Sequence, residues 1–434
     1  MKSKTISTTS IATFPVPPSS VAMPNNTRRE DILLRAFGIT ALAILTLMGV
    51  AGAAPFAYVT SPGIDTETVF VIDTATNNLT ALVPVEGWPR DVAVNPAGTK
   101  VYVATPGFDP TISVIDIATN KVSATVDVGS YPLGVAVNPA GTRVYVTDRD
   151  STNISVIDTA TNTLMAPVNV GLSSYDVAVT PDGKKIYVTN SFNSTTSVID
   201  ATTNKVTATV PVGNSPCEVA FTPDGTKAYV TNSGSNNVSV IDTATDTVTA
   251  TIPVGDGSSD IAVTPNGKKV YVANSYSNNV SVIDTTTNKV TATVSVGATP
   301  MGVAVTPDGK KVYVTNAESD NVSVIDTATN SVTATVNAGK YLIYHPVAVA
   351  IGPFTDSIVT DQSTKANSNV TEDIGAEETS TSSSEENTVE LNNSKNNDSE
   401  SDNGGKPSKN NSIPGFGLLG SLTCLYGGWK LMKK

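Results

Sequence analysis

Residues 302–336 read GVAVTPDGKKVYVTNAESDNVSVIDTATNSVTATV, and this stretch decides the fold. Its Val and Thr residues alternate with other side chains in short runs, which predict β-strands. The expected strands are residues 302–305, 311–315, 321–325 and 331–336. Pro307-Asp308-Gly309 separates the first two runs, and an Asp-Gly pair suits a tight hairpin turn. The stretch therefore predicts a unit of four antiparallel strands.

The same unit occurs seven times along the chain. The Asp of a Val-Ile-Asp motif marks each copy, first after 43 residues and then every 42: Asp73, Asp116, Asp158, Asp200, Asp242, Asp284 and Asp326. A period near 42 with several short strands is typical of a β-propeller blade, whereas helical repeats would show a period of 3.6 residues. The sequence thus predicts an all-β fold, a seven-bladed β-propeller of four-stranded blades.

Proline residues indicate which strand lies at the edge of each unit. Four of the expected fourth strands contain one: Pro84, Pro167, Pro211 and Pro253. Proline has no N–H to donate, so it breaks a central strand ladder but is tolerated at an edge. The fourth strand is therefore expected at the outer rim, and the first strand at the centre.

The phase of the repeat predicts how the ring closes. The repeats open with a second strand at residues 57–60 and end with a first strand at residues 347–351. We expect this C-terminal first strand to complete the blade that the N-terminal second, third and fourth strands begin. Residues 55–352 are thus predicted to form one closed domain.

The repeat motifs resemble those of a known family. Tyr-Val-Thr-Asn occurs whole at residues 187–190, 229–232 and 313–316, together with Val-Ala-Val-Thr-Pro-Asp-Gly and Ser-Val-Ile-Asp motifs. These motifs are similar to those of the YVTN-repeat β-propellers, and the similarity covers all seven units.

The C-terminal residues 413–434 resemble a second known element. Pro414, Gly415 and Phe416 open an apolar run with a basic end, which by itself reads as a short membrane segment. The order is similar to the PGF-type sorting signal of archaeal surface proteins, a family in which an archaeosortase processes the tail. With the propeller, the chain is similar to surface-layer-related antigens of methanogenic archaea. This implies an extracellular envelope protein, anchored to the membrane through a C-terminal lipid or segment.

Two further segments flank the repeats. Residues 1–54 place basic residues before an apolar run and Ala51-Gly52-Ala53-Ala54, the order of a secretory signal peptide, with an uncleaved signal anchor as the alternative. Residues 353–412 are rich in Ser, Thr, Asn and Glu and predict a disordered acidic stalk, because they cannot bury enough apolar surface to fold. The stalk contains four glycosylation sequons: Asn369, Asn392, Asn397 and Asn410.

Composition excludes several classes of function. The chain has 27 Lys and Arg against 39 Asp and Glu, a net charge of −12, so no nucleic-acid partner is expected. Two cysteines and one histidine cannot complete a closed zinc site, and one histidine gives little scope for haem ligation, so no cofactor is predicted. Asp148, Asp150 and Asn153 offer oxygen ligands for Ca²⁺, but they lack the Gly and distal Glu of an EF-hand loop and equally suit a solvated turn.

Function is expected where the units differ. The loops from each fourth strand to the next first strand vary most, and all should lead to one mouth of the central channel. Their aromatic and Arg side chains are of the kinds that anchor interfaces, although unconstrained drift of loop sequences is the alternative. The candidate partner-binding residues are Trp88, Arg90, Tyr131, Tyr175, Met301, Tyr341, Tyr344 and His345.

The sequence therefore predicts a non-enzymatic cell-surface protein whose propeller binds a protein or glycan of the envelope, in adhesion or surface-layer association. No catalytic residue is assigned. The alternative is an extracellular metal-dependent propeller enzyme of the lactonase or lyase type, since propellers host both kinds of function. Such an activity needs acids that converge at the channel, and one group could supply them: Asp91, Asp176, Glu218 and Asp260.

Overall fold

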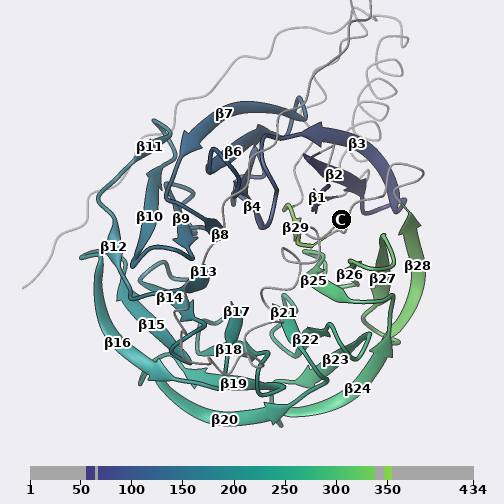
Figure 1. Ribbon diagram of the computed structural model, residues 1–434. Coiled ribbons are helices and arrows are strands. Elements are labelled where there is room, and N and C mark those ends of the chain that lie inside the picture. Colours follow the sequence, from purple (N-terminus) through teal and green to yellow (C-terminus); the bar gives the residue numbers. More distant parts are fainter. Residues whose placement is uncertain (1–54, 64–66, 338–346, 354–434) are drawn as a thin grey trace, which may run out of the picture. The chain divides into compact units, whose positions relative to one another are not determined.

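The computed structural model describes residues 55–63, 67–337 and 347–353. The described residues form seven antiparallel sheets arranged in a ring (Figure 1). The predicted seven-bladed β-propeller of four-stranded blades is thus confirmed. No helix among these residues is long and apolar enough to cross a membrane. The leader, the stalk with its sequons and the sorting segment lie outside the described residues and stay predictions.

Each blade has four strand positions, from the centre of the ring outward. The innermost strands are β29 (Val349–Ile351), β4 (Val92–Val94), β8 (Pro132–Val137), β13 (Ser174–Val179), β17 (Pro216–Phe221), β21 (Ser258–Val263) and β25 (Pro300–Val305). The second strands are β1 (Phe56–Pro62), β5 (Lys100–Thr105), β9 (Arg143–Asp148), β14 (Lys185–Asn190), β18 (Lys227–Asn232), β22 (Lys269–Asn274) and β26 (Lys311–Asn316). We number the blades 1 to 7 in the order of these two lists.

The outer half of each blade follows the same order. The third strands are β2 (Glu67–Asp73), β6 (Thr111–Asp116), β10 (Asn153–Asp158), β15 (Thr195–Asp200), β19 (Asn237–Asp242), β23 (Asn279–Asp284) and β27 (Asn321–Asp326). The outermost strands are β3 (Asn78–Pro84), β7 (Lys121–Asp127), the pair β11 (Thr163–Leu164) and β12 (Val168–Asn169), β16 (Lys205–Pro211), β20 (Thr247–Pro253), β24 (Lys289–Ser295) and β28 (Ser331–Asn337).

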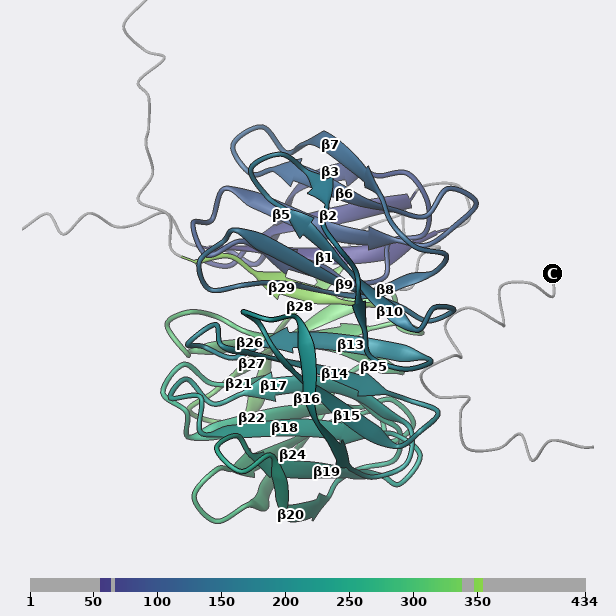
Figure 2. The same cartoon turned by 90° about the vertical axis from the view of Figure 1, so that its left-hand side faces the viewer.

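Blade 1 joins the two ends of the repeat region, as predicted. Its strand order is β29-β1-β2-β3, so β29 lies beside β1 although the two are far apart in sequence (Figure 2). Val349 pairs with Val59, the Thr60 N–H donates to Ala348 O (3.1 Å), and the Val347 N–H donates to Thr60 O (3.0 Å). The C-terminal strand therefore supplies the innermost strand of the first blade.

The outermost strands confirm the interpretation of the prolines, with one difference. Pro84, Pro211 and Pro253 each end an outer strand at the rim. Pro167 stands two residues earlier in its unit, and blade 3 has the two short strands β11 and β12 in place of one continuous strand. A proline inside the run thus divides the outer strand of blade 3.

The hydrophobic core lies between neighbouring blades. In one of the clusters, Tyr271 of blade 6 packs with Val282 of its own sheet and with Val303 and Val314 of blade 7. The seven tyrosines of the second strands are among the largest fully buried side chains. A blade therefore buries its apolar faces only against its two neighbours, which is why the repeat must close into a ring.

The turns between third and fourth strands are held by the Asp of each Val-Ile-Asp motif. In blade 5, Asp242 Oδ1 accepts the N–H groups of Ala244 and Thr245 at 3.0 and 2.9 Å. The turn then ends at Asp246 with a φ of 53°, a left-handed conformation that Asn and Asp tolerate. The aspartate of this motif therefore has a structural role in the turn.

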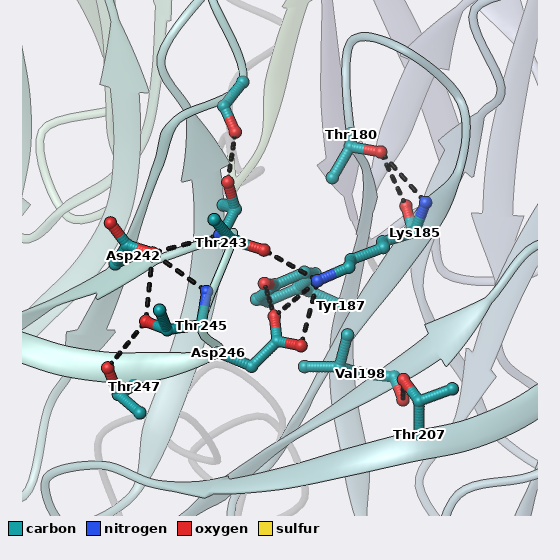
Figure 3. A network of polar contacts seen from close by, with 12 residues as sticks. Thr180, Lys185, Tyr187, Val198, Thr207, Asp242, Thr243, Thr245, Asp246 and Thr247 are labelled. Carbon is teal, nitrogen blue, oxygen red and sulfur yellow. Dashed lines mark hydrogen bonds and ion pairs between the residues drawn. The ribbon is translucent and has the colours of Figure 1, made fainter.

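The residue that ends this turn also contacts the preceding blade, an interaction that we call the tyrosine latch (Figure 3). The Tyr187 hydroxyl of blade 4 donates to Asp246 of blade 5 at 2.5 Å, and Lys185 Nζ forms an ion pair with the same carboxylate at 2.9 Å. The other latches join Tyr229 to Asn288, Tyr271 to Asn330 and Tyr313 to Asn77.

The latches are unevenly distributed around the ring. They join blades 4 to 5, 5 to 6, 6 to 7 and 7 to 1. At the other three junctions the equivalent side-chain oxygens of Asn120, Asn162 and Asn204 are buried and have no hydrogen-bond partner among the described residues. The hydroxyl of Tyr58, which faces the first of these junctions, is likewise buried and unpartnered there.

Candidate functional site

One position of the inner strand carries most of the charged chemistry of the ring. It is the residue that precedes the Val-Ala-Val motif or its variant. Going round from blade 2 to blade 1, it holds Asp91, Gly134, Asp176, Glu218, Asp260, Gly302 and Ala348. Gly134 fits here because a Cβ would come within 2.8 Å of Asp176 Cα. Four of the seven positions thus present a carboxyl group at the centre of the propeller.

A β-bulge sets the direction of these side chains. In blade 7, Pro300 pairs with Asn316 but Val303 pairs with Val314, so the inner strand has an extra residue between them. Four other inner strands, β8, β13, β17 and β21, have the same irregularity. A bulge re-aims a side chain and is common next to active sites.

The position of the variable residues differs from the prediction. Tyr175 and Met301 were expected in loops at the channel mouth, but they belong to β13 and β25. The acids Asp176, Glu218 and Asp260 likewise belong to inner strands, β13, β17 and β21. The inner strands begin earlier than the alternation of apolar residues indicated, because the bulge interrupts that alternation. These residues therefore lie inside the ring of inner strands.

The inner strands enclose a cavity of about 240 Å³. Its lining includes all four carboxyl residues together with Arg90 and Tyr175. Apolar walls come from Leu133, Met301 and the valines of the inner strands, including β29. The C-terminal strand that closes the ring therefore also lines this site.

Three of the carboxylates bridge adjacent blades. Asp91 accepts the N–H of Val92 at one oxygen (2.8 Å) and the N–H of Val135 in the next blade at the other (2.7 Å). Asp260 makes the equivalent contacts, and Asp176 accepts the N–H of Val219 at 3.0 Å. The bridges fix the carboxylates in the wall of the cavity.

Glu218 makes a different contact. Its side chain hydrogen-bonds the carboxylate of Asp176. This bond needs a proton, and the proton belongs on Glu218, because burial and then the charge of Asp176 raise the pKa of Glu218 well above its usual range. Glu218 is therefore a carboxylic acid and Asp176 its carboxylate partner.

The pKa values of the other acids are also raised. Burial, reinforced by the charge of Asp176, raises the pKa of Asp91 to about 7. Burial raises the pKa of Asp176 to about 6, although hydrogen bonds from Glu218 and Val219 oppose the rise. Near neutral pH the cavity thus holds proton donors and proton acceptors side by side, the arrangement that general acid–base catalysis requires.

Arg90 and Tyr175 supply the remaining polar groups. Their side chains are hydrogen-bonded to each other, while burial raises the pKa of Tyr175 to about 12. Threonine hydroxyls of the neighbouring blades position both residues, since Thr60 donates to Arg90 O (3.0 Å) and Thr147 donates to Tyr175 O (2.8 Å). A guanidinium and a phenol can together stabilise negative charge that develops on an oxygen.

The structure separates the predicted partner-binding residues. Arg90, Tyr175 and Met301 line the cavity. Trp88 and Tyr131 do not line it, and the ring of Tyr131 stacks under the Arg149 guanidinium at 3.9 Å. The last three candidates, Tyr341, Tyr344 and His345, lie outside the described residues.

The calcium candidates do not converge on one site. Asp148 accepts the N–H groups of Ser130, Tyr131 and Asp150, whereas the side chain of Asp150 turns to Arg149 in an ion pair of 2.9 Å. Asn153 begins β10. Across the described ranges, no group of three or more His, Cys, Asp or Glu side chains is arranged to hold a metal ion. The channel acids are among the side chains that this finding covers.

Sequence reasoning missed the serines of the cavity. Ser233, Ser258 and Ser259 line it, and the Ser258 hydroxyl is fully buried without a hydrogen-bond partner among the described residues. A signal was available, since Pro132, Pro216 and Pro300 occupy the position in other blades that Ser258 occupies in blade 6. A polar residue at that position marks a difference between units.

Comparison with known proteins supports the propeller and points to an enzyme. The family model "Lactonase, 7-bladed beta-propeller" matches residues 177–351, a range that begins within β13 of blade 4 and ends with β29. No curated protein matches the chain.

Solved structures share the fold. A hydrazine synthase chain from Kuenenia stuttgartiensis is 25% identical, with a TM-score of 0.55 over 64% of this chain and 97% of its own. A Bacteroides fragilis NCTC 9343 chain with a provisional 6-phosphogluconolactonase designation is 19% identical, with a TM-score of 0.58 over 69% and 99%. The periplasmic gluconolactonase of Pseudomonas aeruginosa is 17% identical, with a TM-score of 0.58 over 69% and 99%.

These findings correct the predicted function. The prediction of a non-enzymatic binding protein is wrong, because the match to a lactonase family model favours an enzyme of the lactonase kind. The prediction relied on the scarcity of His and Cys, which excludes some catalytic groups but not paired carboxyl groups.

Proposed function

We propose that the chain is a hydrolase that opens a small lactone ring in the cavity at the centre of the propeller. One observation carries the proposal: four carboxyl groups with raised pKa values line one cavity together with Arg90 and Tyr175. The match of residues 177–351 to a lactonase family model supports the same reaction class.

The reaction needs a base, an acid and a site for an oxyanion. Asp91, with a pKa of about 7, accepts a proton from the attacking water, whose oxygen bonds to the lactone carbonyl carbon. Arg90 and Tyr175 stabilise the negative charge that then develops on the carbonyl oxygen. The ring C–O bond breaks as the tetrahedral intermediate collapses, and Glu218 gives its proton to the leaving ring oxygen.

Asp176 acts as a positioning residue in this scheme. Asp176 is 5% exposed, and its carboxylate is hydrogen-bonded to the Glu218 side chain and to the Val219 N–H. It therefore keeps the proton on Glu218 and fixes the orientation of the Glu218 carboxyl group. Its charge also raises the pKa of Asp91. Asp176 thus adjusts both the acid and the base.

Hydrolysis of D-glucono-δ-lactone, followed as proton release at pH 7, tests the proposal. The purified protein should exceed the spontaneous rate, and Asp91→Asn and Glu218→Gln should each lower kcat/KM by about 100-fold. Asp109→Asn is the matched control, because Asp109 is an exposed acid in the loop after β5. A wild-type rate equal to the spontaneous rate, across this substrate and simple γ- and δ-lactones, would refute the proposal.

We also propose that this hydrolase works at the outside of the cell envelope. The leader in residues 1–54 and the resemblance of residues 413–434 to a PGF-type sorting signal support this location. An archaeosortase-type enzyme would then be the processing partner. Mass analysis of the native protein tests it, since an intact Lys434 would contradict processing.

A further inference from the structure

We infer that the cavity takes an uncharged, hydroxylated lactone and discriminates against a phosphorylated one. The inference rests on the proposed function, because it names the substrate class of the same site. It follows from the charged side chains, the backbone amides and the volume of the cavity, and from the unpartnered hydroxyl of Ser258.

The lining has more acidic than basic side chains. Four carboxyl residues face the cavity, and Arg90 is the one Lys or Arg among its described lining residues. The side chain of Arg90 is already bonded to Tyr175. A phosphate group is usually held by several cationic or N–H donors, often in a bidentate arrangement. Near neutral pH the cavity offers a phosphate one shared guanidinium, opposed by the charge of Asp176 and by the partly ionised Asp91.

Backbone amides are the other usual anion binders, and here they are occupied. The N–H groups of Val92 and Val135 donate to Asp91. The N–H of Val219 donates to Asp176, and those of Ile261 and Val303 donate to Asp260. The protein's own carboxylates therefore take the place that a bound anion would need.

The same carboxylates suit a ligand with many hydroxyl groups. A carboxylate oxygen accepts up to two hydrogen bonds. Each side-chain oxygen of Asp91 and of Asp260 accepts one from the backbone. Ligand hydroxyls can supply further donors. The unpartnered, fully buried hydroxyl of Ser258 at the cavity wall offers one more polar contact, whereas the neighbouring Ser259 hydroxyl already donates to Met301 O at 3.0 Å.

The volume limits the size of the ligand. The cavity of about 240 Å³ is smaller than the roughly 300–1,000 Å³ of sites that hold drug-sized molecules. A single five- or six-membered ring fits this volume, and an added phosphate would have to lie among the acids.

A comparison of two lactones tests the inference on the enzyme. D-Glucono-δ-lactone should be hydrolysed with a kcat/KM at least about 100-fold above that of its 6-phosphate at low ionic strength, because two like charges would be brought together in a poorly solvated site. Asp176→Asn removes the lining carboxylate that stays ionised near neutral pH, so it should narrow this ratio about 10-fold, mainly through KM of the phosphorylated lactone. Asp109→Asn should leave the ratio unchanged. A ratio at or below one overturns the inference.

A binding experiment separates this inference from the proposed reaction. Calorimetry with 1,5-anhydro-D-glucitol and its 6-phosphate measures ring binding without any bond to hydrolyse. Binding of the neutral ring alone supports the inference even if no lactone is opened, in which case only the proposed reaction fails. Equal or tighter binding of the phosphate, or no binding of the neutral ring at millimolar concentration, overturns the inference.

Discussion

Tyr271 and Tyr58 occupy equivalent positions in the repeat but have different partners. Tyr271 donates its hydroxyl to Asn330 at 2.9 Å, whereas the buried hydroxyl of Tyr58 has no partner among the described residues. Tyr271→Phe should therefore lower the free energy of unfolding by about 1 kcal/mol. Tyr58→Phe should cost nothing or stabilise the protein, because it removes an unsatisfied polar group. Urea unfolding of both variants measures these changes. Equal losses of unfolding free energy in the two variants would contradict the assignment of the latches.

The pH dependence of activity should report the carboxyl cluster. Asp91 and Asp176 have pKa values of about 7 and about 6, and both act as carboxylates, so kcat/KM should rise with pH through this range. It should fall again at higher pH, when Glu218 loses its proton. In Asp176→Asn the charge that raises the pKa of Glu218 is gone, so the falling limb should move to lower pH. A falling limb that stays in place would exclude Glu218 as the acid.

At the level of the element, Pro167 explains why one outer strand is divided. The corresponding position holds Thr125 in blade 2, Thr209 in blade 4 and Thr251 in blade 5, all in continuous strands. Pro167→Thr should restore a continuous outer strand in blade 3 and raise Tm by about 2 °C, the effect of up to about 1 kcal/mol from added strand pairing. Calorimetry measures the change in Tm. The control is Pro253→Thr, which lies at a strand end and should change Tm little.

The elements also show what the sequence could and could not predict. The strand order followed from the period and the prolines, because both report directly on the edge of a sheet. The bulge that places Asp260 and Met301 inside the ring could not be predicted in the same way. Its extra residue shows in the sequence only as an apolar alternation that begins a few residues after the true start of the strand. The acids were found as a group from sequence, but their shared proton depends on distances that no repeat pattern encodes.

For the whole molecule, closure through β29 should decide stability. Deleting residues 347–351 removes the inner strand of blade 1 together with the buried side chains of Val347 and Val349. The loss of apolar burial alone should cost about 3 kcal/mol or more, and the freed edge of β1 should promote aggregation. Thermal melting with light scattering measures both effects. A truncated domain that melts like the parent would show that the ring does not need its closing strand.

The uneven latches divide the ring into a stiff arc and a compliant arc. Blades 4 to 7 and the junction back to blade 1 are latched, so amide hydrogens of β18 and β22 should exchange with solvent more slowly than those of β5 and β9. Hydrogen exchange followed by mass spectrometry would show this, and uniform exchange would count against it. Arg90 and Asp91 belong to the compliant arc, and Glu218 and Asp260 to the stiff one. A slow opening motion of the ring would thus change the distance between the base Asp91 and the acid Glu218.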